Sequence, residues 1–204
     1  MRQIRAGAPT LTGQINSMNE NILDNNFQNP EELKTYAHAS FWTRVGASII
    51  DSLIFLPLIW LMFHNALNWK NYYLDLLISI GSLAYKPLME GVYGATIGKM
   101  VIKIKVVSEN YEPIDMDNSF VRNVFYVTSY VLSILTSYYV FHATGFDEVT
   151  NFVDFSQFTQ ANDKFATLNS LMGFVLIFSG VMVAFDRMWQ SLHDKIAKTY
   201  VIEV

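Results

Sequence analysis

Three long apolar stretches decide what this chain can fold into. Val45–Phe63 contains one charged residue, Asp51, and both Val124–Phe141 and Leu168–Phe185 contain none. With a rise of ~1.5 Å per residue, helices of this length are roughly 27 Å long, close to the hydrocarbon thickness of a bilayer. A soluble fold that buried all three would need far more polar residues elsewhere to cover them. We therefore expect helices that span a membrane.

A fourth, weaker stretch covers Tyr72–Met89. It contains Asp75 and Lys86, but both lie near its ends, where a charged side chain can reach the membrane interface. Only 16% of the chain is charged, whereas about a quarter is typical of soluble domains. The expected fold class is an all-α membrane protein, a four-transmembrane-helix bundle with spans at about 45–63, 72–89, 124–141 and 168–185.

The basic residues predict the orientation of the bundle. A cytoplasmic N-terminus places most of them on the inside: Arg2, Arg5, Lys34, Arg44, Lys86, Lys99, Lys103, Lys105, Arg122, Arg187, Lys195 and Lys198. The outside then keeps only Lys70 and Lys164. Cytoplasmic loops of membrane proteins carry an excess of Lys and Arg, so both termini are expected in the cytoplasm.

Residues 1–40 form a polar extension before the membrane domain at 41–204. Asn29, Pro30 and the following Glu31 are typical of a helix start, with an N-cap, a proline at the first position and an acid near the positive dipole end. They predict a short interfacial helix from Pro30 into Phe41. The composition of the extension is too poor in apolar residues to fold alone, so we expect a partner or the cytoplasmic face of the bundle to order it.

A small β element is expected on the cytoplasmic side. In Lys99–Val107 apolar and mostly basic residues alternate, which is the period of a strand. Tyr200–Val204 also has the composition of a strand. The two are predicted to pair and to bury Ile102 and Ile104 against Ile202.

Several function classes are disfavoured. The net charge is −4, whereas nucleic-acid binding selects clustered positive surface. The chain has no cysteine and its four histidines are scattered, so neither a thiolate site nor a zinc motif is expected. The run GATIGKM is not a phosphate-binding loop, because the required glycine and hydroxyl positions hold Tyr93 and Met100. We expect no enzyme activity, no catalytic residues, no cofactor and no metal.

Charged residues in or near the bilayer are the remaining candidates. Arg44 and Asp51 are seven residues apart and share one helix face, with Ser48 between them. An unpaired carboxylate at the depth of Asp51 would cost about 3 kcal/mol, so it must face protein or water.

These residues belong to a larger pattern. Arg44, Asp51, the run YGATIGKMVIKIKVVS at 93–108, Arg122, and QSLHDKIAKTYVIEV at 190–204 together resemble the RDD family of bacterial membrane proteins. The family is named for one arginine and two aspartates, which the resemblance places at Arg44, Asp51 and Asp194, with Ser48, Arg122 and His193 in support. The chain departs from the family at Asn110-Tyr111, where Asp-Gly is usual, and at Lys198, where glycine is common.

The resemblance implies a location in the bacterial cytoplasmic (inner) membrane and leaves the activity open. The first hypothesis is a structural or accessory subunit that lies in the lipid bilayer and assembles with other membrane-protein subunits. The alternative is a proton-coupled cation transporter of the sodium type with Asp51 as the carrier carboxylate, since ionisable residues inside membranes often mark ion paths. A homo-oligomer without other subunits would favour this alternative. In either case Arg44 is predicted to contact Asp194, with Asp51 deeper on the same face.

Overall fold

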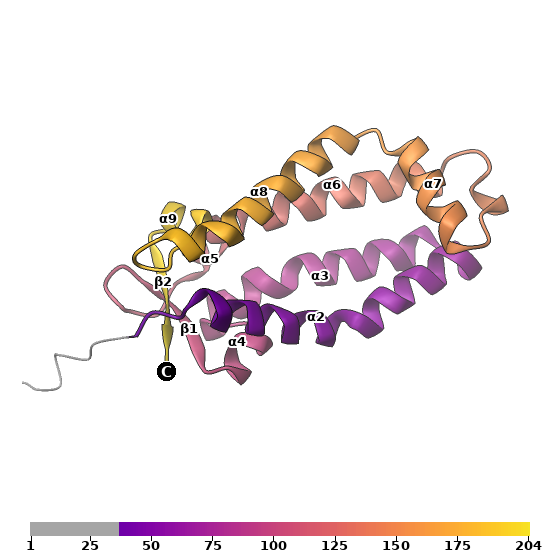
Figure 1. Ribbon diagram of the computed structural model, residues 1–204. Helices are drawn as coiled ribbons and strands as arrows, with labels where there is room; N and C mark the ends of the chain where they lie inside the picture. The colour runs from indigo at the N-terminus through magenta and orange to yellow at the C-terminus, as the bar shows by residue number, and fades with distance from the viewer. Residues whose placement is uncertain (1–36) are drawn as a thin grey trace, which may run out of the picture. The chain divides into compact units, whose positions relative to one another are not determined.

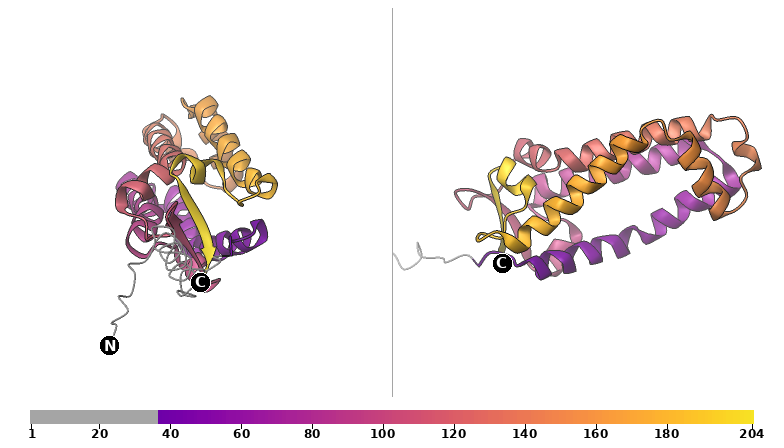
Figure 2. Two further views of the ribbon diagram at one scale, coloured as in Figure 1. Left: turned by 90° about the vertical axis from the view of Figure 1, so that its left-hand side faces the viewer. Right: turned by 45° about the horizontal axis from the view of Figure 1, so that its top comes forward.

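The computed structural model describes residues 37–204. Four long helices run side by side along it: α2 (Phe41–His64), α3 (Tyr72–Tyr93), α6 (Val124–Phe141) and α8 (Ala166–Phe185). α3 packs on α6 and α6 packs on α8, so the helices form a row that curves from α8 to α2 (Figures 1 and 2). Seen from its end, the row is open between α2 and α8 (Figure 2).

Among residues 37–204, three helices are long and apolar enough to cross a membrane. They are Phe41–Trp69, which joins α2 to the π-helix η1 (Asn65–Trp69), and then α6 and α8. The stretch expected as a fourth span forms the helix α3, of 22 residues, but Asp75, Lys86 and Glu90 make it more polar than the other three, and it is not among the helices apolar enough to cross a membrane. Asn71 begins α3 by accepting hydrogen bonds from the backbone N–H groups of its first turn, and Gly94 ends it at φ +72°.

The short elements gather at the two ends of the row (Figure 1). One end, here called the sheet end, holds α4 (Ile97–Val101), β1 (Ile104–Ser108), α5 (Met116–Arg122), α9 (Leu192–Ile196) and β2 (Thr199–Glu203). The other end, here called the loop end, holds η1, the 3-10 helix η2 (Phe146–Glu148) and α7 (Phe152–Asn162).

The predicted pairing of two strands is confirmed. β1 and β2 are antiparallel, with Ile104 opposite Glu203 and Lys105 opposite Ile202. Ile104 is buried in one core with Val201, and Ile102 packs against that core. The predicted packing against Ile202 itself is wrong, because Ile202 lies opposite Lys105 and, although buried, is not part of this core. This small core ties the sheet to the first turns of α2.

The predicted start of the first strand is wrong. Residues Ile97–Val101 form the helix α4 because Thr96 caps it, its side chain accepting a hydrogen bond from the Lys99 N–H. The chain then turns at Lys103, whose φ is +62°, and only from Ile104 does it extend. The alternation of apolar and basic residues over 99–103 therefore reflects a capped helical turn, which short apolar patterns do not distinguish from a strand.

The predicted helix from Pro30 into Phe41 is wrong in its last residues, and its beginning lies outside the described part of the chain. Residues 37–40 are not helical. Instead Ala39 N–H donates to the Val201 carbonyl at 2.8 Å, and His38 bridges to Ile202. This segment adds to the edge of β2, so part of the polar extension belongs to the folded domain.

Both departures from the family pattern coincide with left-handed backbone. Tyr111 has φ +61° and Lys198 has φ +52°, a conformation that glycine adopts at lower cost than residues with a side chain. The chain keeps the turns without the glycines. Tyr111 stacks on Tyr200 of β2, with ring centroids 5.7 Å apart, which offsets part of the strain.

Candidate functional site

The predicted contact between Arg44 and Asp194 is present. Arg44 Nη1 lies 2.6 Å from Asp194 Oδ2, and the Asp194 side chain is fully buried. α9 positions this carboxylate, because Asp194 is the third residue of the helix and its side chain accepts a hydrogen bond from the Ser191 N–H at 3.0 Å. The same carboxylate therefore caps α9 and binds the first turn of α2.

Arg122 is more central than the sequence indicated. It is 3% exposed and comes from the last turn of α5. Its guanidinium forms ion pairs with Asp194 and with Glu90, the latter at 3.1 Å from Nε to Oε2, and donates to Thr199 Oγ1 at 2.8 Å. Arg122 thus joins α3, α9 and β2 at one point.

Glu90 is the second carboxylate of this group, and sequence reasoning missed it. It is 1% exposed and accepts from Lys99, Arg122 and Asn123. The only indication in the sequence that Glu90 has a role was its position directly after the apolar stretch Tyr72–Met89. Arg44, Glu90, Lys99, Arg122 and Asp194 are hereafter called the charge cluster.

The electrostatics of the charge cluster follow from its burial. Burial lowers the pKa of Lys99 to about 8, although the neighbouring Glu90 opposes the shift. Burial would raise the pKa of Asp194, but Arg122 and Arg44 hold it below its usual range. Both carboxylates of the cluster are therefore compensated within the fold.

Asp51 does not join the charge cluster in hydrogen bonding. It accepts from Tyr85 Oη at 3.0 Å, Thr96 Oγ1 at 2.6 Å and Gly98 N at 2.8 Å. These donors belong to α3 and to the start of α4. The predicted triad of Arg44, Asp51 and Asp194 is thus divided in two. Arg44 pairs with Asp194, whereas Asp51 ties α4 to α2.

Two supporting residues have local partners. Ser48 Oγ donates to the Arg44 carbonyl at 3.0 Å, a bond within its own helix. His193 Nδ1 lies 2.9 Å from Ser179 Oγ on α8. Burial lowers the pKa of His193 to about 3, so at neutral pH its ring is uncharged and links α9 to α8.

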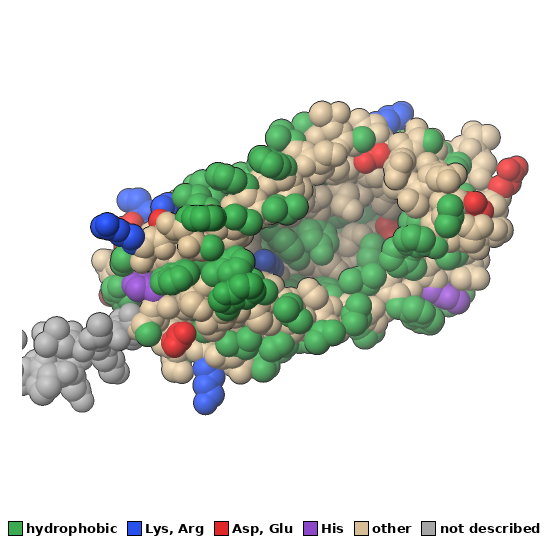
Figure 3. All heavy atoms as spheres, in the orientation of Figure 1, with side chains coloured by type: hydrophobic (Ala, Val, Ile, Leu, Met, Phe, Trp, Pro, Cys, Tyr) green, Lys and Arg blue, Asp and Glu red, His purple; other side chains and the backbone are tan. Residues whose placement is uncertain are grey.

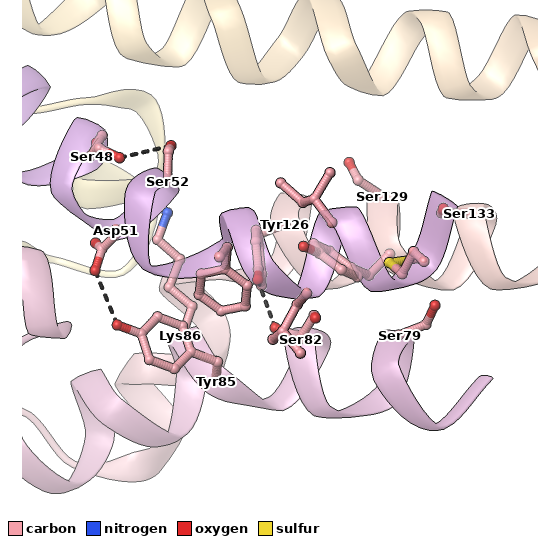
Figure 4. A pocket seen from close by; sticks show the side chains of 15 residues that line it. Ser48, Asp51, Ser52, Ser79, Ser82, Tyr85, Lys86, Tyr126, Ser129 and Ser133 are labelled. Atoms are coloured by element: carbon pink, nitrogen blue, oxygen red, sulfur yellow. Dashed lines mark hydrogen bonds between the residues drawn. The ribbon is translucent and has the colours of Figure 1, made fainter. Parts of the chain in front are cut away.

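A cleft with both hydroxyl groups and apolar side chains in its walls lies between α2 and the rest of the row. Its larger part has a volume of about 570 Å³ and is lined by six serines, three tyrosines, Asp51 and Lys86. Figure 3 shows it as a hollow on the side of the bundle, and Figure 4 shows the hydroxyl groups that face it. A smaller part of about 290 Å³ adjoins it and is lined by Arg44, Lys86, Lys99 and Arg122 among others.

No metal site accompanies this chemistry within residues 37–204. No group of three or more His, Cys, Asp and Glu side chains there is arranged to hold an ion. The charge cluster forms ion pairs and hydrogen bonds, and the cleft places hydroxyl groups around an open volume.

The sequence of the chain matches the family model of the RDD family over residues 38–198. The chain belongs to the RDD family. The match begins in the extended segment that pairs with β2, and it contains every residue of the charge cluster. RDD proteins are membrane proteins, in agreement with the three apolar helices. No curated protein and no solved structure matches this RDD protein.

Proposed function

We propose that this chain is a non-catalytic structural or accessory subunit of a larger assembly in the bacterial inner membrane. It crosses the membrane four times, through α2, α3, α6 and α8, and keeps both termini in the cytoplasm. The observation that supports this role is that Asp51, Glu90 and Asp194 all accept bonds from other parts of the fold. The charges are used to hold the domain together.

The surroundings of Asp51 argue against a proton carrier. A carrier carboxylate must gain and lose a proton while a cation takes its place, which requires free lone pairs. Asp51 has three donors within 3.0 Å, and one of them is the backbone N–H of Gly98. Protonation would weaken the link between α2 and α4.

The topology can be measured with introduced cysteines, since the chain has none. T150C lies at the loop end and N110C at the sheet end, and both positions are exposed. We expect a membrane-impermeant maleimide added to intact cells to label T150C and not N110C, because the sheet end carries the excess of Lys and Arg.

A matched control is to permeabilise the inner membrane, which should make N110C react as fast as T150C. Labelling of N110C in intact cells would contradict the proposed orientation.

The alternative, a proton-coupled cation transporter, has one observation in its favour. The cleft brings hydroxyl groups of Ser82, Tyr126 and Ser129 to the inside of the helix row, where they could replace water around a solute (Figure 4). Asp51 lines the same cleft.

Two variants of Asp51 separate the hypotheses. D51N keeps the acceptor for Tyr85 and Gly98, and its amide can donate to Thr96 Oγ1, so we expect wild-type abundance and unchanged copurifying partners. D51L removes both acceptor oxygens, so three donors lose their partner, at a cost of about 1–3 kcal/mol for each buried group left unpaired; we expect severalfold lower abundance. Immunoblots and purification in mild detergent measure both.

The transporter hypothesis predicts a different result for the same pair. D51N would then abolish cation–proton exchange in reconstituted vesicles at normal abundance. Exchange by the purified wild-type chain alone, lost in D51N, would replace the subunit proposal with the transporter.

A further inference from the structure

Lys86 is a charged residue that lines the cleft but does not belong to the charge cluster. It forms no ion pair within residues 37–204, although its charge interacts favourably with Glu90. Its Nζ lies 5.2 Å from the centroid of the Tyr126 ring. Figure 4 shows its side chain extending from α3 into the cleft, between Asp51 and Tyr126. An ammonium group inside a membrane helix is costly unless an anion or water faces it.

The charges around the cleft leave one positive charge in excess. Its cations are Arg44, Lys86, Lys99 and Arg122, and its carboxylates are Asp51, Glu90 and Asp194. His193 is uncharged at neutral pH because burial lowers its pKa to about 3. Four cations therefore face three carboxylates, so a ligand with a single negative charge would neutralise the site.

An unpaired donor lies in the same region. Arg44 Nη2 is buried and has no hydrogen-bond partner in the described chain, although Arg44 Nη1 and Nε are both bonded. Arg44 lines the smaller part of the cleft together with Lys86. An acceptor in the cleft would satisfy this donor once the side chains that cover it shift.

The shape of the cleft indicates an amphiphile. The smaller part is lined by Arg44 of the first turns of α2 and by Val201 of β2, so it lies at the helix ends, the level at which lipid headgroups lie. Its walls are apolar, with Val45 and Ile49 on α2 and Val183 on α8. The hollow opens along the side of the bundle (Figure 3), where acyl chains surround a membrane protein.

We propose that this part of the cleft binds the phosphate group of an anionic phospholipid, with Lys86 and Arg44 as its ligands and the acyl chains between α2 and α8. Basic pockets between transmembrane helices on the cytoplasmic side are suited to such headgroups. The phosphodiester carries the single negative charge that the site lacks, and its oxygens accept from both cations. This site is independent of the proposed subunit role.

The test compares K86Q with K103Q. Lys103 is an exposed lysine at the same end, so K103Q removes the same charge without touching the cleft. Each purified protein is exposed to phosphatidylglycerol or phosphatidylcholine of identical chains, and bound lipid is counted by native mass spectrometry. We expect the wild type and K103Q to retain phosphatidylglycerol selectively, and K86Q to lose about tenfold in its affinity.

Two further measurements distinguish a lost lipid site from misfolding and from simple anion binding. K86R retains the charge and should retain the lipid, and circular dichroism checks that K86Q keeps its helix content. Inorganic phosphate at millimolar concentration should displace the lipid weakly, because it has no acyl chains. Equal retention of both lipids by the wild type, an unchanged K86Q, or full displacement by inorganic phosphate would each overturn the proposal.

Discussion

Replacement of Arg122 by methionine is expected to destabilise the folded protein by about 3–5 kcal/mol, the typical cost of breaking a buried ion pair from one side. Arg122 is 3% exposed and pairs with both Glu90 and Asp194. Methionine fills a similar volume but leaves two buried carboxylates with fewer cations. Thermal unfolding in detergent, followed by circular dichroism, measures the change.

The control for R122M is K195M at the same end of the molecule. Lys195 pairs with Asp186, but its side chain is 40% exposed, and exposed pairs contribute about 0–1 kcal/mol. We expect K195M to unfold within a few degrees of the wild type. An R122M protein as stable as K195M would show that the charge cluster does not stabilise the fold.

Replacement of Gly98 by alanine is expected to cost about 3 kcal/mol, at the upper end of what one inserted methyl group costs in a packed site. A Cβ at Gly98 would lie 2.1 Å from the Ala47 carbonyl oxygen and 2.8 Å from Asp51 Cγ. The carbonyl is backbone and cannot rotate away, so α4 must move from α2. The Gly98 N–H would then lose Asp51 as its acceptor.

G81A is the matched control, because no other atom would lie within 4 Å of its new Cβ. Gly81 is inside α3, where alanine is favoured over glycine by about 0.5–1 kcal/mol. We expect G81A to be neutral or stabilising and G98A to lower both the unfolding temperature and the abundance in membranes. A stable G98A would show that the approach of α4 to α2 is not required.

The parts of the fold that the sequence predicted rest on strong, local signals. Long apolar stretches fix the helices, and the composition of Tyr200–Val204 fixes β2. The pair Arg44–Asp194 was also foreseeable, because a buried arginine needs a carboxylate and the resemblance supplied one. In each case the signal is either the composition of a continuous stretch or a requirement for charge compensation.

The parts that were missed depend on tertiary contacts. Glu90 and Lys99 are nine residues apart, on either side of the turn at Gly94, so neither has a sequence pattern that indicates their pairing. The fate of Asp51 was open for a similar reason. Its donors include Thr96, whose hydroxyl also caps α4. Thr96 lies just before Lys99–Val107, where the alternation predicted a strand and not a helix.

The link between Arg44 and Asp194 spans 150 residues of sequence, which has a consequence for how the protein is made. Arg44 lies in α2, which leaves the ribosome long before α9 with Asp194 does. Until α9 is translated, Arg44 in the first turn of α2 and Arg122 of α5 both lack Asp194 as a counter-ion. The domain therefore closes only after α9 has been translated, and any nascent chain that stops before α9 carries unmatched positive charge.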